Sequence, residues 1–150
     1  MRLRPNTGRQ VAALLLSLAG SAWAAPACRP ATEFMPRLCP AGLPAVRQVH
    51  IERNAAASTP DAPTFSDCAR FRMTPHLVRR YLRQAWRVSD DAAEHAVDRG
   101  PCEASGTLRF ADGRRARWRI EQVGTATLVI GKQAPVILAC PDCRFAPFGR

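Results

Sequence analysis

Hydrophobic and polar residues alternate along residues 106–121, which is the pattern of β-strands with one buried face. A two-residue Asp112-Gly113 loop would put the apolar residues of the two strands on opposite faces of the hairpin. A three-residue loop with Gly113 in the left-handed conformation keeps one face apolar, because it pairs Phe110 with Arg114. The same register sets Leu108 opposite Ala116 and Gly106 opposite Trp118. The apolar positions are Leu108, Phe110, Ala116, Trp118 and Ile120.

Two more short apolar runs follow, near 127–130 and 136–140, and a turn around Gly131-Lys132 separates them. Short strands joined by turns of this kind predict an antiparallel sheet. The last third of the chain therefore reads as four strands in sequence.

Helical periodicity replaces alternation upstream. Thr74-Pro75 is typical of a helix start, with Thr74 as the cap and Pro75 in the first turn. The predicted apolar face comprises Leu77, Val78, Tyr81, Leu82, Ala85 and Trp86, and the flanks carry Arg79, Arg80, Arg83 and Arg87. Ser89-Asp90-Asp91 can cap a second, shorter helix through about Val97, which Gly100-Pro101 would end.

Proline interrupts the chain repeatedly between 25 and 45, which predicts an irregular arm. Residues 46–51 alternate loosely and can form one strand, and residues 54–64 are small or proline and read as a linker. We therefore predict an α+β domain over 58–150, in which the two helices pack on the disulfide-stapled antiparallel sheet, preceded by a Pro-rich arm and linker at 25–57. Its expected core residues are Leu82, Trp86, Phe110, Trp118 and Ile120.

The first 24 residues have the three parts of a cleavable Sec-type signal peptide. Arginines precede a short apolar stretch at 11–19, and Ala22-Trp23-Ala24 supplies the small residues of a cleavage site. The apolar stretch is well short of the roughly 20 residues that span a bilayer. We expect a bacterial protein that is periplasmic or secreted, with no transmembrane segment in its mature form.

Six cysteines lie beyond the expected cleavage point, and in an exported chain an even number indicates disulfides. In a plain four-stranded meander, the start of the first strand and the end of the fourth lie about 14 Å apart, three strand spacings, which is too far for a disulfide. Either the sheet curls, or the strand order is mixed, or Cys102 pairs with Cys68. The favoured set is Cys28–Cys39, Cys68–Cys102 and Cys140–Cys143.

Two alternatives for the cysteines stay open. Cys140-Pro141-Asp142-Cys143 is a Cys-x-x-Cys motif, the pattern of thiol–disulfide exchange, although it follows a strand rather than opening a helix. Cys68 and Cys102 could also join this pair in a four-thiolate zinc site. The three histidines, His50, His76 and His95, show no metal spacing, and no catalytic arrangement can be identified from spacing. We lean towards a non-enzymatic protein without a cofactor.

The formal net charge is +10, and Lys132 is the only lysine among 22 basic residues. Such a charge favours anionic partners. The solvent face of the predicted hairpin and the flank of the helix supply the candidate anion-binding residues. They are Arg79, Arg83, Arg109, Arg115, Arg117 and Arg119. Aromatic residues that could stack on bases are missing from the hairpin's polar face, which argues against specific single-stranded nucleic-acid binding.

The second half of the chain also carries a framework of cysteines, aromatic residues and turns. It comprises Cys68-Ala69-Arg70-Phe71, Tyr81, Val88-Ser89, Pro101-Cys102, Gly106-Thr107-Leu108-Arg109-Phe110, Asp112-Gly113, Trp118-Arg119-Ile120 and Cys140-Pro141-Asp142-Cys143. In this framework the segment resembles a loose group of small exported proteobacterial proteins of unknown function. The resemblance implies export and a shared scaffold, and it implies no catalytic residue.

Together these observations predict an exported accessory protein that binds a protein partner or an anionic glycan or lipid surface. The alternatives are thiol–disulfide exchange at Cys140 and Cys143 and a zinc-stabilised four-cysteine module.

Overall fold

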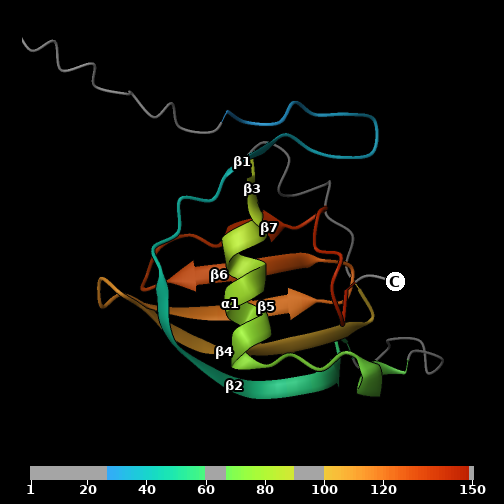
Figure 1. The fold of residues 1–150 in the computed structure, drawn as a ribbon, viewed down its shortest axis with the longest axis vertical. Helices are drawn as coiled ribbons and strands as arrows, with labels where there is room; N and C mark the ends of the chain where they lie inside the picture. The colour runs from blue at the N-terminus through green and yellow to red at the C-terminus, as the bar shows by residue number, and fades with distance from the viewer. Residues whose placement is uncertain (1–26, 60–66, 90–99, 149–150) are drawn as a thin grey trace, which may run out of the picture.

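The structure, a computed structural model, describes residues 27–59, 67–89 and 100–148. These residues are mostly β. Seven strands form one open antiparallel sheet in the order β1-β3-β7-β6-β5-β4-β2, accompanied by one short α-helix and a 3-10 turn (Figure 1). The strands are β1 (Leu38–Pro40), β2 (Val46–Ala57), β3 (Trp86–Val88), β4 (Cys102–Phe110), β5 (Arg115–Glu121), β6 (Thr125–Ile130) and β7 (Val136–Ala139). The helix is α1 (Pro75–Gln84), and the 3-10 turn is η1 (Cys68–Arg70).

Strands β4 to β7 form the predicted meander, and the predicted hairpin register is confirmed. Gly106 lies opposite Trp118, and the backbone N–H of Phe110 donates to the carbonyl of Arg114 at 2.9 Å. Gly113 has a φ of 88°, the left-handed conformation that this loop requires. In the same loop, the backbone N–H of Arg114 donates to Asp112 and lowers the pKa of that carboxyl.

Helix α1 begins as predicted and ends earlier than predicted. The Thr74 hydroxyl accepts a hydrogen bond from the Leu77 N–H at 3.2 Å, but Ala85 is already extended. Trp86 therefore lies in β3 and not on the helix. The prediction that Trp86 belongs to the main core is wrong. Strand β3 pairs with both β1 and β7, and these partners are far away in sequence, so helical periodicity alone cannot reveal them.

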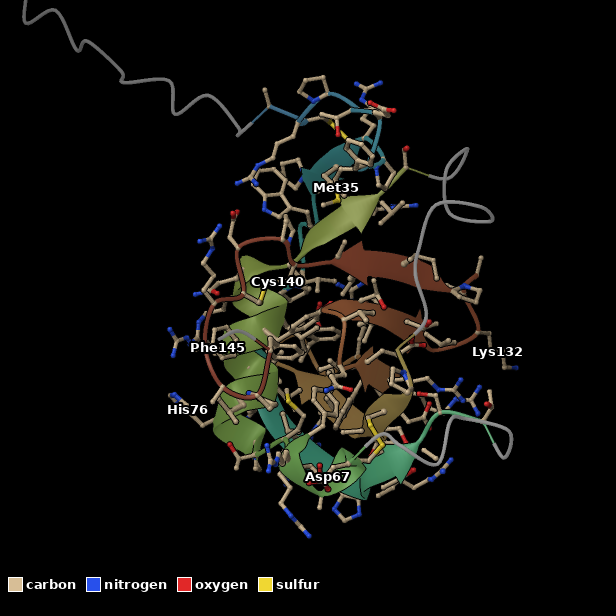
Figure 2. All side chains as sticks on the ribbon, turned by 90° about the vertical axis from the view of Figure 1, so that its right-hand side faces the viewer. Met35, Asp67, His76, Lys132, Cys140 and Phe145 are labelled. Atoms are coloured by element: carbon tan, nitrogen blue, oxygen red, sulfur yellow. A yellow bond between two sulfur atoms is a disulfide. The ribbon has the colours of Figure 1, made fainter. Side chains whose placement is uncertain are left out.

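Trp86 is half-buried against a second, smaller cluster of Leu38, Val88 and Ala139. The other four expected core residues are buried in the main cluster, between α1 and the sheet. Figure 2 shows α1 on one side of the sheet only. There the Tyr81 hydroxyl donates to the carbonyl of Gly124 at 3.0 Å, and burial, followed by the nearby Glu121 carboxylate, raises the pKa of Tyr81.

The segment expected as an arm and linker contributes both edge strands of the sheet. Strand β2 contains the predicted strand at 46–51 but continues to Ala57, so residues 54–57 are strand rather than linker. It pairs along the whole of β4, from Phe110 to Cys102, with three irregularities in register. Backbone hydrogen bonds from β4 stabilise this small-residue stretch despite its low β-propensity. The second predicted helix beyond Ser89 and the predicted signal peptide lie outside the described residues.

Three disulfides hold the fold together, in the pairing that the sequence favours: Cys28–Cys39, Cys68–Cys102 and Cys140–Cys143. The second bridge ties η1 to the start of β4, and the third closes the turn after β7. Three disulfides are typical of an oxidising, extracytoplasmic environment. Among the described residues, no helix is long and apolar enough to cross a membrane.

Candidate anion-binding site on the open face of the sheet

The sheet face opposite α1 carries a row of arginines. Along β4 and β5, alternate residues point to opposite sides, so the apolar residues enter the core and Arg109, Arg115, Arg117 and Arg119 remain exposed. We call the surface formed by these four residues the arginine face. The four residues lie where the hairpin register predicts.

Two members of the arginine face lie directly opposite each other. Arg109 on β4 pairs in register with Arg115 on β5, and like charges at such positions destabilise a sheet. Arg109 donates a hydrogen bond to the side-chain oxygen of Gln48 at 3.0 Å, which leaves its charge uncompensated. Neither Arg109 nor Arg115 has an ion-pair partner within the described parts of the chain. An anion bound between the two guanidinium groups would relieve this repulsion.

A hollow of about 440 Å³ lies at this pair. Its polar lining comes from three strands: Gln48 and His50 on β2, Thr107 and Arg109 on β4, and Arg115 and Arg117 on β5. The register places His50 beside Thr107 and Thr107 beside Arg117, so these side chains form one row across the sheet. Most of the polar groups that line the hollow can donate hydrogen bonds. Such a site can bind a carboxylate, sulfate or phosphate group.

The far end of the arginine face has a different electrostatic character. Glu103 on β4 is only 1% exposed, and its two carboxylate oxygens lie 3.3 Å from Arg53 and from Arg119. Neither oxygen has a well-aligned hydrogen bond among the described residues, so charge attraction is what holds the group. Because Glu103 neutralises part of the charge of Arg119, the uncompensated positive charge is concentrated at Arg109, Arg115 and Arg117.

The structure separates the six arginines that the sequence suggests for anion binding. Arg79 and Arg83 belong to α1 and lie on the other side of the sheet from the arginine face. The Arg79 guanidinium donates to the carbonyls of Val46 and Arg47, at 3.4 and 3.1 Å, and so links α1 to β2. Arg83 is exposed on the flank of the helix. The six residues therefore do not form one site.

Sequence reasoning missed the contribution of β2 to the hollow. Gln48 and His50 lie in the strand that the alternation predicts, but their position beside Thr107 depends on the pairing of β2 with β4. No local pattern specifies that pairing. The only available signal is the polar side of the 46–51 alternation, which matches the polar side of the hairpin.

Among the described residues, those that line the hollow include no carboxylate, thiol or serine. Across the described residues, no group of three or more His, Cys, Asp or Glu side chains could bind a metal ion. His50 and His76 lie apart, on β2 and α1, and His95 lies outside the described residues. The arginines and other donors of the hollow suit binding of an anion.

No protein-family model, no curated protein and no solved structure matches this chain.

Proposed function

We propose that the protein is a non-enzymatic, exported binding protein that attaches to an anionic surface through its arginine face. The observation that carries the proposal is the cross-strand pair of Arg109 and Arg115 at the hollow, with Arg117 beside it and no compensating carboxylate among the described residues. This arrangement costs stability, and bound anionic groups would offset that cost. The three disulfides are consistent with an exported protein.

The environment of Cys140 and Cys143 favours binding over thiol–disulfide exchange. Both residues are 6% exposed, and a turn follows them where a redox-active motif needs a helix N-terminus. All six cysteines are paired with each other, whereas a zinc site needs free thiolates. These observations support the binding proposal and argue against both alternatives.

Vesicles that contain phosphatidylglycerol test the proposal. Binding to them should fall with rising salt, and the double substitution Arg115→Glu with Arg117→Glu should weaken it at least tenfold, because each basic residue near an anionic membrane contributes about 1 kcal/mol. Co-sedimentation at several salt concentrations measures both effects.

Arg72→Glu and Arg144→Glu, made together, are the matched control, since they reverse two exposed arginines outside the arginine face. This double variant should retain most of the binding. An equal loss in the control would show that only net charge matters and would overturn the assignment to this face. If the protein binds dextran sulfate but not vesicles, the arginine face remains the proposed binding site, and its partner is an anionic glycan rather than a lipid surface.

A further inference from the structure

A second cavity lies on the opposite side of the sheet, beside α1. Residues 41–45, which we call the strap, connect β1 to β2 and pass along one side of the helix (Figure 1). Between the strap and α1 is a groove of about 870 Å³, a size typical of small-molecule sites. Its apolar lining comes from the strap and its ends, from α1 and from β3: Pro40, Leu43, Val46, Leu82, Ala85 and Trp86.

The walls of this groove are tied together at both ends. At one end, Pro40 of β1 pairs with Trp86 of β3, and the Cys28–Cys39 disulfide holds β1 to the preceding segment. At the other end, the Arg79 guanidinium bonds the carbonyls of Val46 and Arg47 to α1. The groove is therefore preformed, and a ligand would not have to pay for ordering it.

The charged groups at the groove favour an anion. Asp142 already forms an ion pair with Arg29 at 2.8 Å, and the Arg29 guanidinium lies 4.2 Å from the centre of the Trp86 ring. Arg83 is exposed and has no ion-pair or hydrogen-bond partner among the described residues. Within the part of the chain that the structure describes, Arg79 bonds only to neutral carbonyls. Two uncompensated guanidinium groups thus lie on the same helical flank as the apolar wall.

We infer that the groove binds an amphipathic anion, a single apolar chain that ends in a carboxylate. The carboxylate lies at Arg83 and Arg79, where charge-assisted hydrogen bonds are available. The chain extends between Leu43 of the strap and Leu82 of α1 towards Trp86. This site is distinct from the arginine face and does not depend on the function proposed for it.

Decanoate and decanol, each below its aggregation concentration, separate the two parts of the inference. Calorimetric titration should give tighter binding for decanoate. Arg83→Gln should lower the affinity for decanoate about tenfold, which is the smallest loss expected when a hydrogen bond to a charged group is removed. The affinity for decanol should change by less than about twofold. Hexanoate should bind at least tenfold more weakly than decanoate, because each buried methylene contributes about 0.8 kcal/mol.

Amide and indole NMR spectra locate the ligand. The indole signal of Trp86 should shift on addition of decanoate, while that of Trp118, buried on β5, should not. Arg72→Gln serves as the control for loss of one exposed arginine and should bind decanoate normally. The double variant Arg115→Glu with Arg117→Glu should also bind decanoate normally. The proposal for the arginine face and the inference for the groove can therefore be contradicted independently of each other.

Three results would overturn the inference: no binding of decanoate, equal affinity for decanoate and decanol, or a shift of Trp118 without one of Trp86. A short peptide with an apolar C-terminal residue provides the last comparison. If it binds while decanoate does not, the groove takes a protein terminus, and the inference of a single-chain carboxylate is wrong.

Discussion

The two faces of strands β4 to β6 share one backbone and one set of hydrogen bonds, yet their side chains have opposite roles. On the face towards α1, Phe110 and Ile120 are fully buried. On the other face, Arg109 and Arg115 lie opposite each other without a compensating carboxylate among the described residues. One face is arranged for stability, whereas the other tolerates repulsion. This difference between the two faces is the reason for the binding role proposed for the arginine face.

The buried face should give the largest effect on stability. Phe110→Ala removes a fully buried ring, and we expect it to lower the free energy of unfolding by about 3–5 kcal/mol. Arg115→Ala, one strand away on the arginine face, should change it by less than about 0.5 kcal/mol, because exposed side chains contribute little. Urea unfolding followed by far-ultraviolet circular dichroism measures both. Comparable losses in the two variants would contradict the division into a stabilising and a binding face.

Glu103 is the exception that sharpens the comparison, because it is a buried charge on the otherwise exposed face. Removing both of its partners, by Arg53→Ala with Arg119→Ala, should cost about 3 kcal/mol, since the carboxylate would remain buried without a countercharge. Glu103→Gln should cost no more than about 1 kcal/mol, because the two arginines are half-exposed and regain water. The same urea titrations test this asymmetry. A larger loss for Glu103→Gln than for the double arginine variant would contradict it.

Tyr81 should give a smaller effect at neutral pH than Phe110 or the arginine partners of Glu103, and a distinctive one in alkali. Tyr81→Phe removes one of two hydrogen bonds to the Gly124 carbonyl, which still accepts from the Cys140 N–H at 2.9 Å, and this loss should cost about 1 kcal/mol. Burial raises the pKa of Tyr81 above its ordinary value of 10.0, so its contribution is complete below pH 10 and declines as the pH rises above that. The melting temperature of the wild type should therefore fall more steeply above pH 10 than that of Tyr81→Phe. Parallel curves would show that the hydroxyl is not buried in the folded protein.

The parts of the fold that local patterns specify could be predicted from the sequence. The Gly113 loop fixes the register of the hairpin, and Thr74-Pro75 fixes the start of the helix. The place of Trp86 could not be predicted, because β3 forms only through pairing with β1 and β7. The extension of β2 to Ala57 depends in the same way on β4. Long-range backbone pairing overrides local propensity at both places.

The same limit applies to the candidate site. The alternation along β4 and β5 predicts the arginine face residue by residue. It does not predict that Gln48 and His50 complete the hollow, because they come from a strand whose partner has no local signal. The sequence also suggests Arg79 and Arg83 as members of the same anion-binding site because of their charge. Charge alone does not show which side of the sheet the helix covers.

Strand β7 has only four residues, yet it is the only link between the β1–β3 pair and the rest of the described sheet. It follows both of those strands in the chain, β1 by about a hundred residues. Strands β1 and β3 can pair with each other, but they join the rest of the described sheet only through residues 136–139. The seven-stranded sheet is therefore complete only when β7 is in place, and disruption of residues 136–139 would leave the β1–β3 pair without a strand that joins it to the main sheet.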